Sequence, residues 1–365
     1  MTEHHQIGSD WFSKPGDSLR NLMQRKGISA DEVGSHLGGV SVLRGILDGS
    51  RAIDEDIAAK LVAAAGGTIG FWLERQRRYD VALDKAVNTA IQNESDDWLN
   101  WVPVPGKKFR GKLTADRVRS ELRNRMSFFN VPSIEVWQNR YGKHRESTLF
   151  RTSGSFTSED ASVLLWLRRG ELEADLVTTQ PWNVQMLRDR IFEIRKLSRI
   201  RRPSQFLPKL KSLCAEAGVA VVVVKTPAGC HASGASRLVG PNKAMLLLSF
   251  RHRTDDQFWF TVFHEIGHLV MHGAKAFVDV ETAFEDHYER EANEFAAACI
   301  VPENRIPELM SLNADRNEVL RFSVSLGVAP GLVVGQMQHR GHITHREMNF
   351  LKRRWSWGDI DPALV

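Results

Sequence analysis

The order of hydrophobic and polar positions predicts a mainly helical chain with a small sheet. From Asp17 to Tyr79, short segments with apolar residues three and four apart alternate with glycines, as in a series of short amphipathic helices. Two continuous apolar runs, Val219–Thr226 and Lys243–Phe250, predict buried or half-buried strands. A longer apolar stretch, Phe258–Gly273, has the length of a helix. We therefore expect a mainly α chain of the α+β class.

The N-terminal segments predict an all-helical helix-turn-helix domain. Five short helices are expected over residues 18–27, 28–39, 40–49, 54–67 and 68–80, with a tight turn between the second and the third. Ser29 and Glu32 have the spacing of a capping box at the second helix, and Asp54 is expected to cap the fourth. This arrangement is typical of DNA-binding domains of the phage-repressor type.

The fifth segment resembles a known family. Residues 71–80 read F-W-L-x-x-Q-x-x-Y-D, and the stretch resembles HigA-like antitoxins, in which a helix-turn-helix precedes that signature. The resemblance implies operator DNA as a partner, with Ser41, Arg44 and Arg51 on or just after the recognition helix. Residues 17–80 hold nine basic and nine acidic residues, so charge adds no support. A module for interaction or homodimer formation stays open as the alternative.

Composition narrows the setting of the protein. The chain has 365 residues and a net charge of +5, which suits two or three domains. Its three cysteines, Cys214, Cys230 and Cys299, are too few for a disulfide framework, so we expect the reducing cytoplasm. The N-terminus lacks the apolar core of a signal peptide, and no apolar run reaches the roughly 18 residues that span a membrane. We expect no membrane partner.

The middle of the chain is basic. Residues 100–213 hold 23 Lys and Arg against 11 Asp and Glu. Val118, Leu122 and Met126 fall at four-residue intervals and predict an amphipathic helix there. The charge excess fits a solvated helical face, which we favour, or a surface that attracts nucleic acid or an acidic partner.

The apolar stretch 258–273 contains the strongest chemical signal, His264-Glu265-Ile266-Gly267-His268. On a helix, two His four residues apart lie on one face and can bind one metal ion, with Glu265 directed at the water that the ion polarises. Burying two imidazoles and a carboxylate in an apolar helix without a partner would be costly. A metal ion is the simplest partner.

A catalytic zinc site needs a third protein ligand. The helix predicted over residues 287–302 offers Glu289, with Asn293 one turn later as a supporting partner of a ligand His. Ala292 and Ala296 keep the same face small enough for close approach to the first helix. Two competitors are less favoured. His272 suits a histidine facing the helix dipole, and Glu291 suits a solvated helix charge.

These motifs resemble the ImmA/IrrE family of zinc-dependent metallopeptidases. H-E-I-G-H is followed by E-x-E-A-N-x-F-A-A and then a proline, and the resemblance extends over about residues 208–357. It implies a zincin-like fold, Zn²⁺ bound by His264, His268 and Glu289, and Glu265 as the general base. We expect three parts: a helix-turn-helix domain (12–82), a mostly helical basic connecting region (83–200) and a metallopeptidase domain (201–365).

The expected function is a DNA-binding regulator fused to a zinc endopeptidase that cleaves a specific protein in response to a signal. The substrate would be a repressor, an antitoxin or the chain itself. Residues 227–242 are rich in Gly, Ser and Pro and predict a loop that joins the two strands. Cys230 in this loop could act as a regulatory fourth zinc ligand, although a plain loop cysteine is the favoured interpretation. The oxyanion-stabilising residue stays open among four residues: His231, Arg251, His287 and Tyr288.

Two other classes of function stay open. One is a non-proteolytic antitoxin or transcriptional repressor with a structural zinc site, against which the intact Glu265 argues. The other is a nucleic-acid-sensing module that controls a protease acting elsewhere.

Overall fold

The computed structural model describes residues 12–106, 111, 114–142, 158–273 and 282–361. It is mainly helical with one small mixed sheet, so the predicted fold class is confirmed. The chain divides into two compact units, Met1–Thr178 with Pro227–Gly229 and Thr179–Thr226 with Cys230–Val365. The expected boundaries after residues 82 and 200 stay a prediction.

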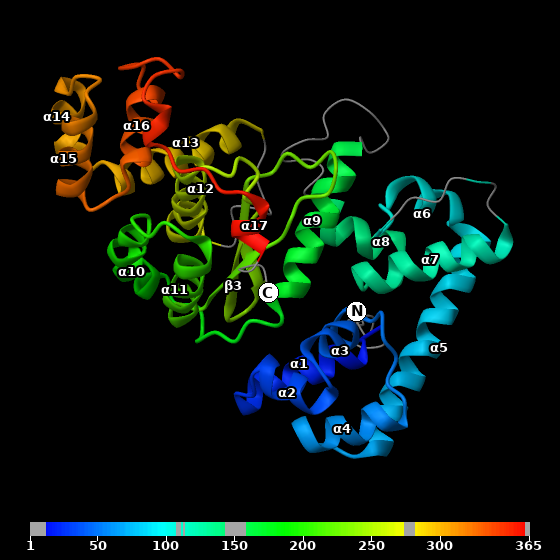
Figure 1. Cartoon of the computed structure of the whole chain (residues 1–365). Helices are drawn as coiled ribbons and strands as arrows, with labels where there is room; N and C mark the ends of the chain where they lie inside the picture. The colour runs from blue at the N-terminus through cyan, green and yellow to red at the C-terminus, as the bar shows by residue number, and fades with distance from the viewer. Residues whose placement is uncertain (1–11, 107–110, 112–113, 143–157, 274–281, 362–365) are drawn as a thin grey trace, which may run out of the picture. The chain divides into compact units, whose positions relative to one another are not determined.

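The first unit begins with four short helices around one core (Figure 1). Their bounds are α1 Pro15–Lys26, α2 Ala30–Leu37, α3 Val40–Asp48 and α4 Glu55–Ala65. Leu19, Val33, Leu43 and Leu61 point inward with no exposed surface. The predicted caps are confirmed, since the Ser29 and Glu32 side chains cap α2 reciprocally and Asp54 accepts from the backbone of Ile57 in α4.

The fifth helix is longer than predicted. α5 runs from Ile69 to Asn93, whereas the sequence pattern predicted an end near Asp80. The apolar spacing continues through Leu83, Val87 and Ala90, which are buried, and no glycine or proline interrupts it. These residues join a second core with α6 Ser95–Trp101, α7 Ala115–Phe129, α8 Ile134–Trp137, the π-helical turn Gln138–Gly142 and α9 Ser158–Ala174.

The helix predicted from Val118, Leu122 and Met126 is α7, and the latter two side chains are fully buried. The first residues of this basic tract, 107–110 and 112–113, lie outside the described residues. Several cations of the middle region are paired inside the first unit rather than solvated. Arg125, for example, is 4% exposed and lies 2.8 Å from the carboxylate of Glu121. A solvated face therefore accounts for only part of the charge excess.

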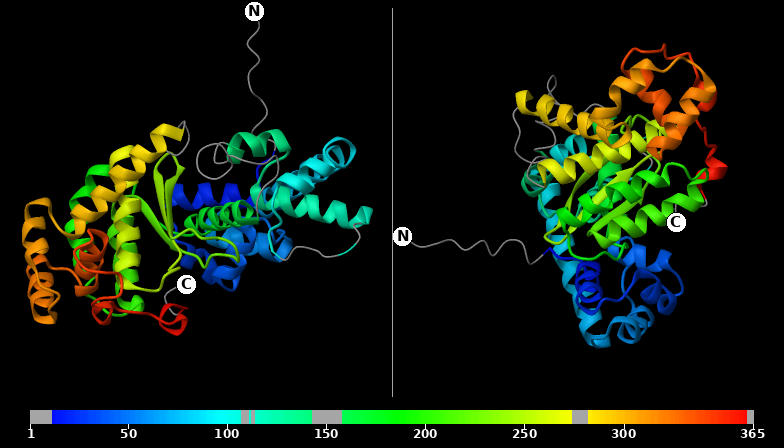
Figure 2. Two further views of the ribbon diagram at one scale, coloured as in Figure 1. Left: turned by 90° about the horizontal axis from the view of Figure 1, so that it is seen from above. Right: turned by 90° about the vertical axis from the view of Figure 1, so that its left-hand side faces the viewer.

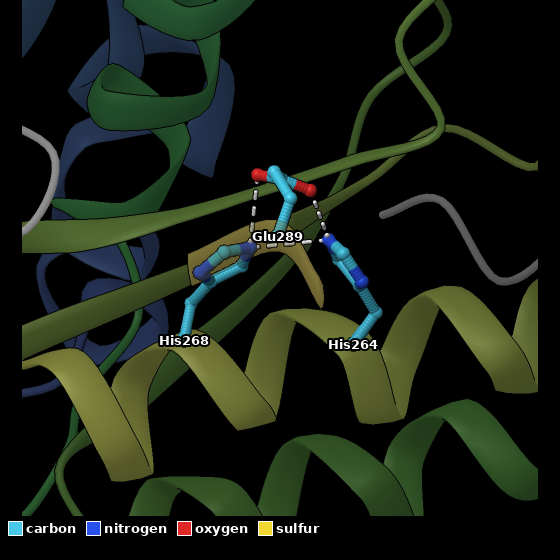
Figure 3. A group of neighbouring side chains, drawn as sticks. All are labelled: His264, His268 and Glu289. Atoms are coloured by element: carbon cyan, nitrogen blue, oxygen red, sulfur yellow. Dashed lines mark hydrogen bonds and ion pairs between the residues drawn. The ribbon is translucent and has the colours of Figure 1, made fainter. Parts of the chain in front are cut away.

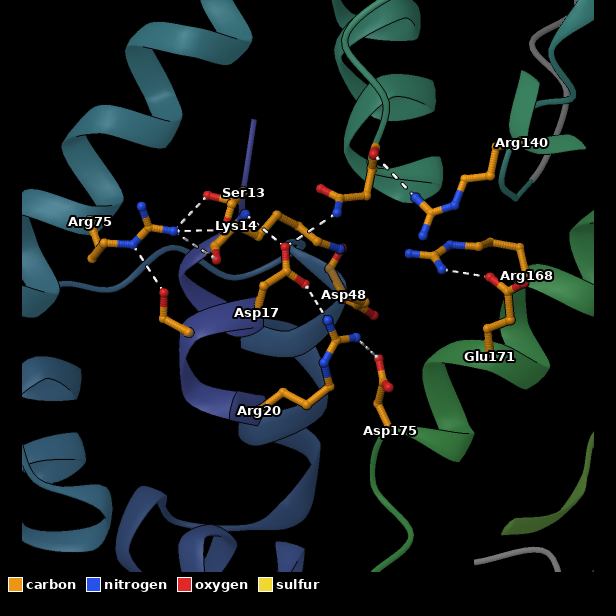
Figure 4. Close-up of polar contacts among 12 residues, drawn as sticks. Ser13, Lys14, Asp17, Arg20, Asp48, Arg75, Arg140, Arg168, Glu171 and Asp175 are labelled. Carbon is orange, nitrogen blue, oxygen red and sulfur yellow. Dashed lines mark hydrogen bonds and ion pairs between the residues drawn. The ribbon is translucent and has the colours of Figure 1, made fainter. Parts of the chain in front are cut away.

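A buried lysine lies just before α1 (Figure 4). The side chain of Lys14 is 1% exposed, and its Nζ donates to the backbone carbonyl of Asp48, the last residue of α3, over 3.2 Å. Loss of hydration on burial lowers the pKa of Lys14 to about 7. Close by, Arg20 of α1 pairs with Asp175, which follows α9, at 2.8 Å.

The second unit contains the sheet. β1 Val219–Val223 and β3 Lys243–Leu248 pair in parallel, which confirms both predicted strands. A third strand, β2 Gly234–Gly240, pairs antiparallel with β3, so the strand order is β1-β3-β2 and β2 lies at an edge. The sequence pattern predicted a loop here, and that prediction was wrong. Small polar residues suit a loop locally, but the pairing with β3 satisfies the backbone of this segment.

Helices cover the sheet and complete the unit (Figure 2). α11 packs on β1, and α12 packs on β2 and β3. The helices of this unit are α10 Val184–Leu197, α11 Pro203–Glu216, α12 Asp255–Gly267, α13 Thr282–Ile300, α14 Ile306–Ser311, α15 Arg316–Leu326, α16 Pro330–His339 and α17 Trp357–Ile360. By itself, no described helix has both the length and the apolarity to cross a bilayer; α15 and α16 meet the criteria only as a pair bent by 107°.

A C-terminal segment holds the start of α12. Two hydrogen bonds of 3.0 Å join Arg353 and Asp255. The backbone N–H of Asp255 donates to the carbonyl of Arg353, and the backbone N–H of Arg353 donates to the Asp255 carboxylate. The backbone N–H of Trp355 donates to the carbonyl of Arg253 over 2.9 Å, and its indole N–H donates to Arg201 just before α11. Residues 353–355 therefore fix the N-terminus of α12 to the rest of the unit.

Candidate metal centre

His264 on α12 and His268, the first residue of the π-helical turn that follows, lie on one face because the opposite face of α12 is buried in the core. Trp259, Phe263 and Ile266 have no exposed surface, which leaves the face of His264 and His268 for other contacts. A π-helical turn, His268–His272, follows α12 without a break. Such turns are uncommon and often occur at functional sites.

Small residues bring α13 close to α12. Ala292 and Ala296 are fully buried, and a Cβ atom added at Gly267 would lie 3.3 Å from the Cα of Ala292. The close approach expected from the sequence is therefore present. As a result, Glu289, three residues before Ala292, lies over His264 and His268 (Figure 3).

His264, His268 and Glu289 form one cluster. The two Nε2 atoms are 3.1 Å apart, and each lies 3.2 Å from a carboxylate oxygen of Glu289. Within the described part of the chain, these three are the group of His, Cys, Asp and Glu whose ligand atoms all lie within 4.8 Å of one another. Two ligands that bind zinc at 2.0–2.1 Å in a tetrahedron are about 3.3 Å apart, so the spacing fits such an ion.

The outward nitrogens of both histidines have partners. His264 Nδ1 lies 3.0 Å from Oδ1 of Asn293, the contact that the sequence predicted. His268 Nδ1 lies 3.2 Å from Nδ1 of His272, a contact that the sequence analysis did not foresee. Both rings are thus oriented with Nε2 toward the cluster, which is the usual arrangement of metal-binding histidines.

Glu265 lies under the edge strand β2. It is 6% exposed, and the hydroxyl of Ser236 lies 2.8 Å from its Oε2. Gly234 of the same strand is pressed against it, because an added Cβ would lie 2.8 Å from Cγ and Oε1 of Glu265. Burial raises the pKa of Glu265, although the neighbouring histidines and Ser236 oppose the shift. The sequence pattern predicts a loop at β2 and therefore gives no signal for Ser236 and Gly234.

Contacts within the cluster shift the pKa values of His264 and Glu289 in opposite directions. Burial tends to lower the pKa of His264, but the hydrogen bond with Glu289 and the charges of Glu265 and Glu289 raise it overall. Burial tends to raise the pKa of Glu289, but its contacts with both histidines hold that pKa well below its usual range. Glu289 is therefore an anion, as a carboxylate ligand must be.

The other predicted site residues of the second unit lie elsewhere. Cys230 is 5% exposed and is not a member of the cluster, so its role as a switch stays a prediction. His231 and Arg251 contact each other, with Arg251 Nη2 3.0 Å from His231 Nδ1. Tyr288 packs on the ring of His272, with the centroids 4.6 Å apart. These contacts do not rank the candidates for oxyanion stabilisation.

The predicted DNA-contacting residues lie on and after α3. Ser41 and Arg51 are exposed, which suits that role. Arg44 is half-buried, and its Nε lies 2.9 Å from a carboxylate oxygen of Glu173 in α9. Their role in binding DNA stays a prediction.

A groove of about 1500 Å³ lies beside the cluster, between α12, α13, α14 and α16. Glu289 and Asn293 line one part of it, and much of its remaining wall is apolar, including Phe260, Phe295 and Met310. The groove can therefore accept apolar side chains next to the cluster.

Comparison with known proteins places the cluster in a family context. No curated protein and no solved structure matches the chain. Residues 217–330, which include β1 to α15, match the family model Peptidase_M78, the IrrE N-terminal-like domain. The stretch that carries the cluster is thus similar to the metallopeptidase domain of the IrrE type.

Proposed function

We propose that the protein is a zinc-dependent endopeptidase joined to a DNA-binding helix-turn-helix domain. The observation that carries this proposal is the cluster of His264, His268 and Glu289, with Glu265 directly after His264 on α12. Two imidazole nitrogens and one carboxylate are the donor set of a catalytic zinc site that keeps one position for water. A cation would also balance the charge of Glu289.

Zinc, when bound, supplies a polarised water and a Lewis acid for the peptide carbonyl. The protein residues then handle the proton. Glu265 accepts it at Oε1, because Oε2 is held by Ser236, and passes it to the leaving amine. The raised pKa of Glu265 makes its carboxylate a stronger proton acceptor.

The edge strand suggests how a substrate is held. Among the described residues β2 pairs only with β3. We propose that an extended peptide pairs with the other side of β2 and passes over Glu265. The groove would take an apolar side chain of that peptide. We propose a specific protein as the substrate, such as a repressor, an antitoxin or the chain itself.

The packing of α2 against α3 supports the DNA-binding part. A Cβ atom added at Gly34 would lie 3.0 Å from the backbone nitrogen of Val40, so the two helices meet closely after the turn Gly38-Gly39. A short second helix and a tight turn of this kind would present α3 to the major groove.

Comparison of Glu265→Gln with the wild type tests the proposal. Each protein is expressed beside its genomic neighbours, and the proteome is searched for a fragment formed only by the wild type. We expect equal zinc content and loss of cleavage in Glu265→Gln. The control variant Glu216→Gln neutralises an exposed carboxylate on α11, away from the groove, and should cleave normally. Cleavage by Glu265→Gln would refute the general-base role. Zinc binding without cleavage by either protein would favour an antitoxin or repressor with a structural zinc site.

A further inference from the structure

A row of side chains continues outward from His268. His268 Nδ1 lies 3.2 Å from His272 Nδ1, and His272 Nε2 lies 2.8 Å from Oε2 of Glu291. The other oxygen of Glu291 lies 3.1 Å from Nε2 of His287. The side chain of His272 is 3% exposed and that of Glu291 is 31% exposed, so Glu291 is not the solvated charge that the sequence favoured.

The direction of His268 Nε2 toward the cluster determines which ring nitrogens of this row carry protons. His268 directs Nε2 toward His264 and Glu289, and a nitrogen that binds a metal ion carries no proton. The neutral ring of His268 must then carry its proton on Nδ1 and donate it to Nδ1 of His272. His272 in turn carries its proton on Nε2 and donates it to Glu291. One assignment of tautomers satisfies both contacts.

We propose that His272 and Glu291 are positioning residues that hold His268 in its metal-binding tautomer and orientation. The proposal rests on the proposed zinc peptidase. It gives His268 the support that Asn293 gives to His264 from the same helix α13. Glu291 lies two residues after Glu289 on α13. The same helix therefore supplies a ligand to the cluster through Glu289 and, through Glu291, a hydrogen-bond partner for the His272 ring that contacts Nδ1 of His268.

The local backbone explains how His272 reaches His268. Residues 268–272 form a π-helical turn, which is wider than an α-helical turn and keeps residues four apart on one side of the axis. Gly273 then ends the helix in a conformation with φ of 60° and ψ of −170°. His272 is therefore the last side chain that the helix can place under the cluster.

Zinc affinity tests the proposal without reference to catalysis. Metal-free full-length protein competes for zinc with a chromophoric chelator. His272→Phe keeps a ring against Tyr288 but removes both hydrogen bonds, and we expect its Kd for zinc to rise about 10–100-fold. His272→Asn keeps an acceptor near the position of Nδ1 and should regain much of the lost affinity. Glu291→Leu should weaken binding about 10-fold, Glu291→Gln less, and Glu294→Gln not at all.

The outcomes separate this proposal from the proposed function. A wild type that binds no zinc would overturn both. A wild type that binds zinc, with His272→Phe and Glu291→Leu within twofold of it, would overturn only the positioning role. Should a variant fold poorly, ¹⁵N-histidine spectra of the zinc-loaded wild type decide the question. A protonated Nδ1 on His268 is expected, and coordination of zinc through Nδ1 would overturn the proposal.

Discussion

Substitution of one glycine tests whether the edge strand positions the general base. Gly234 of β2 faces Glu265, and its φ is not in the left-handed region, so Gly234→Ala adds only steric volume. The new Cβ would lie 2.5 Å from Cγ2 of Thr261 and 2.8 Å from Cγ and Oε1 of Glu265. Ordinary contacts begin near 3.4 Å, so the atoms must separate by about 0.6–0.9 Å.

The size of the expected effect follows from that displacement. A misplacement of about 1 Å can lower the rate of an enzyme about 100-fold. We therefore expect kcat/KM of Gly234→Ala to fall about 10–100-fold. Zinc content should not change, because the nearest atoms to the added methyl group belong to Thr261 and Glu265, neither of which is a proposed zinc ligand. Overpacking should also lower the free energy of unfolding by about 1–3 kcal/mol.

The assay compares cleavage of the protein substrate with zinc content and urea unfolding. Gly240→Ala is the matched control, because it adds the same methyl group to the same strand with no atom within 4 Å. We expect it to behave as the wild type. If Gly234→Ala cleaves as fast as Gly240→Ala, then β2 does not fix the position of Glu265 and the reasoning fails.

Three further results are expected in other parts of the chain. The pKa of Lys14 is lowered from 10.5 to about 7, so the unfolded chain binds more protons between these pH values. Stability should therefore rise with pH across that window, by up to about 5 kcal/mol. The stability measured by hydrogen exchange in α1 should rise with pH in the wild type and not in Lys14→Met. Equal dependence on pH in the two proteins would contradict the burial of a neutral amine. Glu173→Gln releases Arg44 from its ion pair and should tighten operator binding in gel shifts about 1.5–5-fold, whereas neutralising the exposed Asp56 should have less effect. Trp355→Ala removes a buried indole that packs on Phe206, Phe250 and Phe258. It should lower the free energy of unfolding in urea by about 3–5 kcal/mol. A similar loss in Phe350→Ala, which truncates an exposed ring, would show that the cost is not specific to the buried indole.

The sequence was most informative where local spacing decides the structure. His264 and His268 face one way because of helical periodicity alone, and Ala292 and Ala296 identified the face of α13 that carries Glu289 toward α12. Strands β1 and β3 were also visible in the sequence, because a continuous apolar run suits a strand buried on both faces.

Features that depend on contacts between residues far apart in the sequence could not be predicted from local spacing. β2 consists of residues that suit a loop, and only its pairing with β3 makes it a strand. The sequence favours a helix-end role for His272, because nothing in its local pattern reveals its partner. That partner, Glu291, lies 19 residues later on a helix that packs against it. In the same way, Arg44 gave no sign of its contact with Glu173, which is 129 residues later.

The hydrogen bonds between residues 353–355 and the start of α12 affect when, during synthesis, α12 can be fixed in place. A ribosome makes the chain from the N-terminus, and earlier parts fold first. By the time Asn293 has emerged, Glu265 and all three proposed metal ligands have been made, but the anchor of Asp255 is still missing. We expect α12 to become firmly seated only after Trp355 leaves the ribosome. Peptidase activity would then begin after the remainder of the protein has had time to fold, so a growing chain is protected from its own active site.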